Sequence, residues 1–274
     1  MSNQSKENSY KEALKELAAN CGECCGICCV ALYFTKMDGF PEDKRPGKPC
    51  SNLTDDFKCK IHSDLMKHQL KGCMAYDCFG AGQKVTREIY KGLDWREHSE
   101  CAGEMFQVFL IVYQLHQMLW YLIEAHKATS KNIQNQLTLL IQENKEMTKM
   151  KPAEILGVDV EEYRQRVNSG LKEVCHSLNK GLKQDKKTFN YMGKSFKKQN
   201  LDGEDFSMAL LIAADLEGCS LRKTNFLGAD MRDANLNNTD LSESLFLTQM
   251  QINTARGNSN TIIPESLIKP DTWK

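Results

Sequence analysis

The sequence predicts a multi-domain α+β protein with three unlike parts: an irregular cysteine-rich module, an α-helical bundle and a short coil of repeats. Ten of the twelve cysteines lie between residues 21 and 101. Apolar residues then recur at helical spacing, and near the C-terminus ten large apolar residues recur at every fifth position. The predicted boundaries are 1–100 for the cysteine-rich module, 101–198 for the helical bundle, 199–249 for the repeats and 250–274 for a capping tail.

The cysteine-rich module begins with CGECCGICC at residues 21–29, which places five thiols in nine positions. Loop signals such as Gly39-Phe40-Pro41 follow and periodic elements are few, so this segment needs a cross-link to fold. Residues 1–20 lack the apolar core of a secretory signal, which predicts a cytoplasmic protein. Disulfides are rare in that compartment, so dense cysteine indicates metal or redox chemistry.

The spacing Cys21-x2-Cys24 is typical of a zinc knuckle, in which a short turn directs two sulfurs to one ion. Eight thiols are the predicted ligands: Cys21, Cys24, Cys28, Cys29, Cys50, Cys59, Cys73 and Cys78. They suffice for two four-coordinate sites or for one polynuclear site, with Cys25 and His62 as spare candidates. Zinc is the expected cofactor and an iron–sulfur cluster is the alternative, because cysteine-only ligation suits both. The sequence leaves open whether the metal has a structural role or a catalytic or sensing role.

The module resembles the CxxCxxCC cysteine-cluster family, also described as zinc- or iron-chelating. The resemblance rests on Cys21, Cys24, Cys28 and Cys29 and on the later stretches GKPCSNL, FKCKIH and GCMAYDCFGAGQ. The spacing here is C-x2-C-x3-C-C with Cys25 inserted, which leaves open whether Cys24 or Cys25 is a ligand. Some relatives of that family are associated with protein modification, including flagellin lysine methylation. The resemblance therefore implies an alternative function as an iron–sulfur-dependent protein-modifying enzyme.

Residues 102–196 are helical by pattern. Apolar side chains recur on one helix face at Phe106, Phe109, Leu110, Tyr113, Trp120 and Ile123, and 132–147 continues the type. Pro152 marks the start of a new helix. Residues 160–182 predict one or two further helices, broken near Gly170 and Gly181. The apolar stretch 105–123 contains three glutamines and His116, so it predicts a buried helix rather than a membrane span.

Other chemical side chains have simpler explanations. His116 and His126 are predicted to be hydrogen-bonded helix residues, and Cys175 and His176 point to different helix faces. Cys101, with His98 before it, is an outlying candidate for the module. The stretch GAGQK at 80–84 lacks the spacing of a phosphate loop and follows Cys78 directly, which predicts a turn that closes the metal site. No catalytic constellation is visible, so the sequence predicts no catalytic residues and disfavours an enzyme.

The third part repeats every five residues without a slip. The large apolar positions are Leu201, Phe206, Leu211, Leu216, Leu221, Phe226, Met231, Leu236, Leu241 and Phe246. Small residues precede them by two positions from Ala209 to Ser244, with Cys219 as one of the set. A period of five fits neither a helix nor a strand. It predicts a narrow four-sided coil with one large and one small residue facing inward on each side.

This part resembles the pentapeptide-repeat family, A(D/N)LXX. The resemblance implies a right-handed quadrilateral β-helix with four pentapeptides in each coil. It extends into the stretch LFLTQMQINTARGNSNTIIPESLIKPDTW, which looks like the terminal segment of some family members. That tail should cover the last coil, because an open coil end exposes unpaired backbone groups.

Charge limits the functions that these parts suggest. The chain has 36 basic and 36 acidic residues, so no global attraction to nucleic acid or membrane is expected. Some pentapeptide-repeat proteins imitate DNA and protect gyrase, and residues 199–248 carry nine acids against three bases. The predicted rod, however, imitates only about three or four base pairs. The favoured function is a metal-binding scaffold for a protein partner; a homodimer stays open as well.

Overall fold

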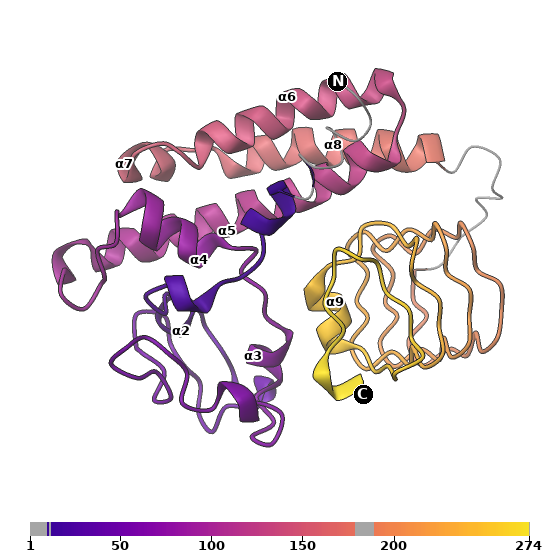
Figure 1. Cartoon of the computed structure of the whole chain (residues 1–274), viewed down its shortest axis with the longest axis horizontal. Helices are drawn as coiled ribbons and strands as arrows, with labels where there is room; N and C mark the ends of the chain where they lie inside the picture. The colour runs from indigo at the N-terminus through magenta and orange to yellow at the C-terminus, as the bar shows by residue number, and fades with distance from the viewer. Residues whose placement is uncertain (1–9, 11, 179–188, 274) are drawn as a thin grey trace. The chain divides into compact units, whose positions relative to one another are not determined.

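The computed structural model describes residue 10, residues 12–178 and residues 189–273 (Figure 1). The chain divides into two compact units. The first contains the chain up to Cys73 together with Asp77–Leu171. The second contains Met74–Tyr76 and the chain from Lys172 onward. Each is described by itself.

The helices of the first unit are built on α5, Ser99–Ala128, which packs against α6, Lys131–Met147, and α7, Pro152–Leu156. Pro152 occupies the first turn of α7, as predicted. By length and composition α5 could cross a membrane, and 56% of its most apolar window is buried inside the protein. Its buried face includes Val108, Phe109 and Val112, all fully covered, so α5 serves as the core of this unit.

The last helix of the region, α8, runs from Val160 to Leu178 without interruption. The predicted break at Gly170 is therefore wrong, while the one at Gly181 lies outside the described residues. A Cβ at Gly170 would lie 3.2 Å from Leu137 of α6. Tyr163 donates from its hydroxyl to the Leu140 carbonyl over 2.8 Å. Gly170 thus permits close packing of two helices instead of ending one.

The cysteine-rich module consists of loops and very short helical turns. These are η1 Cys21–Glu23, α2 Cys28–Ala31, η2 Lys36–Asp38, η3 His62–Asp64, α3 Lys71–Ala75, α4 Ala81–Gln83 and the π-helical turn η4 Lys84–Ile89. Two isolated antiparallel bridges, Phe34 with Lys44 and Leu53 with Cys59, tie the loops together. Contacts of α2 and α4 with α5 attach the module to the helices.

The repeat segment forms a coil of stacked turns, orange to yellow in Figure 1. Every fifth residue from Asn190 to Asn225 forms a parallel bridge with the residue twenty positions further along. One turn of the coil therefore contains four five-residue sides. In the described part of the chain these pairings are isolated bridges and no continuous strand is assigned. The bridges begin at Asn190, upstream of the predicted boundary at 199, because Tyr191 and Phe196 already fill the large inward position.

The inside of the coil follows the predicted two-residue pattern. None of the ten large apolar residues is more than 8% exposed, and the small residues from Ala209 to Ser244 are buried as well. Where a small residue is polar, its hydroxyl donates to a carbonyl of the preceding turn. The Thr224 hydroxyl lies 2.8 Å from the Leu201 oxygen, and Ser244 makes the same bond to Leu221. The buried hydroxyls therefore cost little, because each is hydrogen-bonded.

The corners of the coil require a left-handed backbone. Every fifth residue from Gly193 to Asn238 has a positive φ, and six of these ten residues are not glycine. A left-handed residue other than glycine costs about 1–2 kcal/mol. Eight of these corners also donate a backbone hydrogen bond to a carbonyl further along the coil, as from Met208 to Leu227 over 2.8 Å. The regular ladder of such bonds offsets the repeated strain.

The tail continues the coil. Arg256 and Ile262 form parallel bridges with Asn235 and Asp240, and α9, Gln249–Thr254, lies between the last repeat and these bridges. The side-chain amide of Gln251 donates to the carbonyls of Phe226 and Ala229, each over 2.9 Å. A final turn, η5 Asp271–Trp273, places Trp273 against the backbone at Gly257. The tail thus pairs with backbone groups of the last coil.

Candidate metal centre

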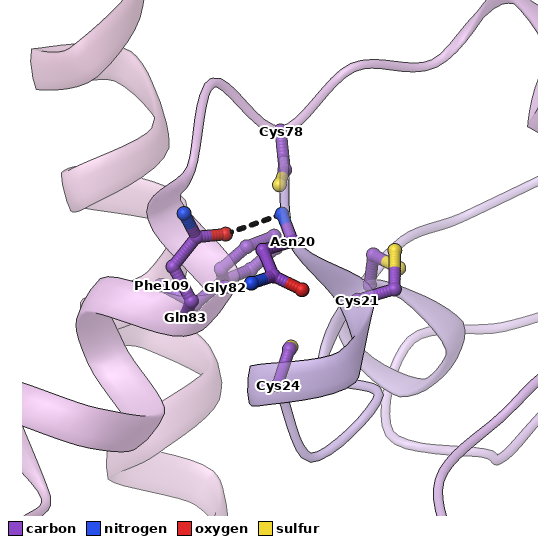
Figure 2. A pocket seen from close by; sticks show the side chains of 8 residues that line it. Asn20, Cys21, Cys24, Cys78, Gly82, Gln83 and Phe109 are labelled. Carbon is purple, nitrogen blue, oxygen red and sulfur yellow. Dashed lines mark hydrogen bonds between the residues drawn. The ribbon is translucent and has the colours of Figure 1, made fainter. Parts of the chain in front are cut away.

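Four of the predicted ligands line one small cavity. Its walls are Asn20, Cys21, Cys24, Cys28, Cys78, Gly82, Gln83 and Phe109. Figure 2 shows Cys21, Cys24 and Cys78 reaching this space from the N-terminal turn and from the segment before α4. The cavity volume is about 20 Å³, enough for one small guest. Thiols separated by more than fifty residues in the chain therefore surround one atom-sized space.

The walls of this cavity are tied together by Gln83. Its side-chain oxygen accepts from the Asn20 backbone N–H over 2.7 Å, drawn as a dashed line in Figure 2, and its nitrogen donates to the Ala18 carbonyl over 2.8 Å. Asn20 in turn caps the turn that carries Cys21. The GAGQ stretch after Cys78 thus forms part of the wall of this cavity.

Backbone N–H groups point at several sulfurs. Burial raises the pKa of Cys24, and hydrogen bonds from the Ile27 and Gly26 backbone oppose that rise. Burial likewise raises the pKa of Cys78 to about 12, and hydrogen bonds from the backbone of Gly82 and Gly80 oppose that rise. Donors of this kind stabilise a thiolate once a cation has displaced the proton. Burial outweighs these donors in both segments, so the net shift of each pKa favours the protonated thiol.

The other four predicted ligands interact with one another beside Lys44. Burial and, to a smaller extent, the neighbouring Cys29, Cys50 and Cys59 together raise the pKa of Cys73 to about 12. The Cys50 backbone N–H donates to the Cys29 carbonyl over 2.9 Å, which holds these two residues together. The Cys28 thiol hydrogen bond and the Lys44 charge lower the pKa of Cys29. Cys28, Cys29, Cys50 and Cys73 all act on the charge of Lys44. Cys21 in turn interacts with Cys29 and Cys59, so these thiols and the cavity thiols form one continuous electrostatic network.

Lys44 itself is buried, with 9% of its surface exposed. Its ammonium donates to the carbonyls of Val30 and Leu32 over 3.1 and 2.6 Å. Burial lowers the pKa of Lys44, and the charges of Cys29, Cys50, Cys28 and Cys73 raise it. A lysine is almost never buried without a charge partner. Cys29, whose pKa is lowered by the Cys28 thiol hydrogen bond and by the Lys44 charge, is the thiol best suited to be its charged partner.

The two spare candidates lie elsewhere. Cys25 is buried with its sulfur 3.3 Å from the Thr86 hydroxyl and 4.0 Å from the Met105 sulfur, and burial raises its pKa to about 11. The structure thus places Cys24, and not Cys25, at the cavity. His62 is exposed at the start of η3. Cys101 contacts the His98 carbonyl instead of the module thiols.

The remaining candidates fill structural positions. His116 and His126 are buried, with ring nitrogens bonded to the Phe79 carbonyl over 2.7 Å and to the Thr138 hydroxyl over 3.0 Å. Cys219 occupies a small-residue position inside the coil and contacts the Phe196 carbonyl. Cys175 accepts from the Asn225 amide, whereas His176 is exposed. These placements agree with the predicted structural roles.

The cavity can be tested for its fit to a metal ion. In the described chain no three cysteine, histidine or acidic side chains converge closely enough to hold an ion as they stand. Half of the lining residues are cysteines, with soft sulfur donors, and Gly82 keeps the space beside them open. A Cβ at Gly82 would lie 2.7 Å from the Cys24 sulfur and 4.0 Å from the Cys78 sulfur. The four cysteines are donors of the type that thiolate-binding ions prefer, but they do not converge on one point in this structure.

Sequence reasoning missed three residues of this region. Lys44 stands in the charged stretch EDKRPGK, where nothing marks it as buried. Asp77 lies near Cys21 and Cys78, and burial raises its pKa. The sequence predicts Gly82 only as part of a turn. The one available signal was the direct succession of Cys78 by a glycine-rich stretch.

Comparisons with known proteins show which family this chain belongs to. Eight copies of the pentapeptide-repeat model match residues 195–226 and 209–246. A protein of Bacillus subtilis strain 168 is 44% identical over 266 residues, which cover 94% of this chain and 95% of the relative. It is described as the uncharacterized protein YybG. This chain belongs to the YybG family. No solved structure matches the chain.

Membership of the YybG family extends over both regions of the chain, because the match covers nearly all of it. The pentapeptide-repeat match covers the coil only. It identifies a repeat domain of the kind suited to protein interactions. The likeness to YybG brings no activity, because that protein is itself described as uncharacterized.

Proposed function

We propose that this member of the YybG family is a cytoplasmic metal-binding protein whose helices and repeat coil form a scaffold for a protein partner. The observation that carries the metal proposal is the cavity lined by Cys21, Cys24, Cys28 and Cys78. All twelve cysteines lie in the described part of the chain and all are free thiols. Free, clustered thiols favour metal ligation over a disulfide framework.

Zinc is the proposed ion. It binds four thiolates in a tetrahedron and requires no redox partner, which suits a structural site in a loop-rich segment. The thiols would give up their protons to the solvent as the ion binds. Backbone donors to Cys24 and Cys78 and the charge of Lys44 would then stabilise the resulting negative sulfur.

The test is metal analysis of protein purified without oxygen and with a thiol reductant. At least one equivalent of zinc per chain is expected, in a colourless solution. A brown protein containing iron and sulfide would favour the iron–sulfur enzyme instead. Less than one equivalent of zinc plus iron would contradict metal binding. The Cys219→Ala variant is the matched control, because that thiol lies inside the coil and should leave the metal content unchanged.

For the coil we propose the right-handed quadrilateral β-helix of the pentapeptide-repeat family. The twenty-residue bridge spacing and the left-handed corners support it. Its handedness would be settled by a crystal structure of the full chain. A left-handed coil would contradict the assignment.

A scaffold role for the coil is favoured over imitation of DNA by its charge pairing. Between residues that the structure describes, four of the nine acids in the repeats form ion pairs: Glu217 with Lys197, Asp230 with Arg232, Asp233 with Arg256, and Glu243 with Arg222. Each pair is surface-exposed and adds little stability. Together they place cations among the acids, which interrupts a uniformly negative face. Gyrase supercoiling assays with a quinolone should therefore show no protection by this protein.

A further inference from the structure

The two ends of the repeat coil differ in how their backbone is paired. At the C-terminal end the tail adds further bridges to the last turn. At the N-terminal end, Ser195 and Asn200 bridge only to the following turn among the described residues, whereas Asp215 in that next turn bridges on both sides. Figure 1 shows the first turn, in orange, at the far end of the coil from α9. The first turn therefore presents a backbone edge that another chain can pair with.

The first turn also departs from the repeat at one position. In later turns the residue two places before each large apolar residue is small and buried, from Ala209 to Ser244. In the first turn none of the residues at this position is small and none is buried. These four end residues, one on each side of the coil, are Phe189, Lys194, Gln199 and Glu204. The coil thus ends in four large side chains of different chemistry.

Two of the end residues carry opposite charges beside the same aromatic ring. The Lys194 ammonium lies 5.2 Å from the centroid of the Tyr191 ring and 4.8 Å from that of Phe196. Burial raises the pKa of Tyr191, and the charges of Glu204 and Asp205 add to that rise. The Tyr191 and Phe196 rings are each 6% exposed and fill the interior of the first turn. A cation and an acid therefore flank the aromatic interior at this end.

The four sides of the first turn differ in charge. In chain order, sides one to four are residues 189–193, 194–198, 199–203 and 204–208. Side one exposes Phe189 and Met192, at 60% and 56% of their surfaces. Side two carries three lysines and no acid, and side four carries two acids and no base. Since sides two and four are opposite in a four-sided coil, the end is basic on one edge and acidic on the other.

This pattern of sides is complementary to itself. Two copies that meet at their first turns are related by a two-fold axis across the coil. An axis through sides one and three exchanges side two with side four, so Lys194 of each copy meets Glu204 of the other. Phe189 and Gln199 each meet their own equivalent, and a glutamine amide both donates and accepts. An axis through sides two and four would oppose like charges, and a diagonal axis would pair no opposite charges at all.

We propose that the N-terminal end of the coil is a homodimer interface, in which two copies of this chain stack their first turns about the axis through sides one and three. The rotation makes the facing backbone edges antiparallel, a direction in which extended chains pair. A carboxylate has about four acceptor sites, so Glu204 accepts from the second copy beside its contacts within its own chain. Stacking of one narrow turn buries less than a standard interface, so the dimer is weak and reversible. It does not depend on the proposed metal binding.

The test is analytical ultracentrifugation of the full-length protein in reducing buffer, over a concentration range of about 1 µM to 1 mM. The wild type should show a monomer–dimer equilibrium. Lys194→Glu and Glu204→Lys should each lower the dimer affinity by at least about tenfold, because each opposes like charges twice across the interface. Lys223→Glu makes the same charge change at an exposed position of the second turn and is the matched control, which should keep the wild-type affinity.

Mixing the two single variants tests the symmetry of the interface. A Lys194→Glu chain and a Glu204→Lys chain present opposite charges to each other at both contacts, so an equimolar mixture should form heterodimers although neither variant pairs with itself. The double variant Lys194→Glu/Glu204→Lys should regain the wild-type affinity for the same reason. Gln199→Lys opposes two cations on side three and should also weaken the dimer. It keeps the test decisive if a change at Lys194, which contacts Tyr191, disturbs the fold.

Three results would overturn the proposal. The first is a wild-type protein that stays monomeric at the highest concentration. The second is a dimer whose affinity is the same in the wild type and in all the single variants of the first turn. The third is a pair of single variants, folded by circular dichroism, that do not associate when mixed. The metal content of these samples tests the proposed function separately, because a metal-free protein that dimerises in this way supports the interface alone.

Discussion

The repeat coil and the cysteine-rich module stabilise their interiors in opposite ways. In the coil every large inward residue from Leu201 to Phe246 is at most 8% exposed, and the same backbone bonds recur at every turn. In the module the interior contains thiols, such as those of Cys24 and Cys28, which are only partly buried. A coil of this kind is stabilised by its own side chains, whereas the proposed function makes the loop-rich module depend on an ion bound by its sulfurs.

Removal of metal is the largest perturbation of this comparison. A chelator in reducing buffer should abolish amide protection from hydrogen exchange across residues 21–100 and leave residues 199–249 protected. Structural zinc contributes on the order of 10 kcal/mol to folding of small modules. Chelator already saturated with zinc is the control. Equal loss of protection in both regions, or none in the module, would show that the two do not differ as proposed.

A core truncation in the coil should produce the reverse pattern. Phe226 is fully buried, and its ring stacks on that of Phe206 with 5.8 Å between centroids. Phe226→Ala should lower the free energy of unfolding by about 3–5 kcal/mol without changing the metal content. Met192→Ala removes a 56% exposed side chain and should change it by less than about 0.5 kcal/mol. Loss of metal from the folded Phe226 variant would contradict the separation.

The coil and the cysteine-rich module also differ in how much of their structure the sequence predicts. The sequence predicts that Leu216 and Thr224 face inward, because a strict period of five is consistent with a narrow coil. The thiols give no such order. Cys21-x2-Cys24 predicts a local knuckle, but only the folded chain brings Cys78 to it and buries Lys44. No sequence period predicts which residues of irregular loops come together when they are far apart in the chain. Gly170 shows the same limit in the helices, since packing against α6 overrides its weak helix propensity.

Acid is expected to destabilise the protein through His116, a buried residue of α5. Burial lowers the pKa of His116 to about 4, from an ordinary value of 6.5, with the Phe79 carbonyl opposing the shift and Lys84 adding to it. Native protein therefore keeps His116 neutral while the unfolded chain takes up the proton. Stability falls as pH drops from 6.5 toward 4, and this loss ends below 4. It amounts to about 3 kcal/mol.

Denaturant titrations from pH 7 to 4.5 test this slope. His116→Gln can retain a donor for the Phe79 carbonyl and has no proton to gain, so its stability should fall less than that of the wild type. The difference between the two at pH 4.5 should be about 2 kcal/mol. His176→Gln changes an exposed histidine and should keep the wild-type slope. Parallel pH profiles for wild type and His116→Gln would contradict burial of a neutral ring.

The smallest expected effect tests whether the cavity matters as a space. Gly82→Ala adds a single methyl group 2.7 Å from the Cys24 sulfur, so that sulfur or the backbone must shift, at about 1–3 kcal/mol. Gly103→Ala is the matched control on α5, where a Cβ meets nothing within 4 Å and should stabilise the helix by about 0.5–1 kcal/mol. If the cavity holds an ion, Gly82→Ala should release one ion at a lower chelator concentration than wild type while Gly103→Ala does not. Unchanged retention in the folded Gly82 variant would show that the four thiols do not close on that space.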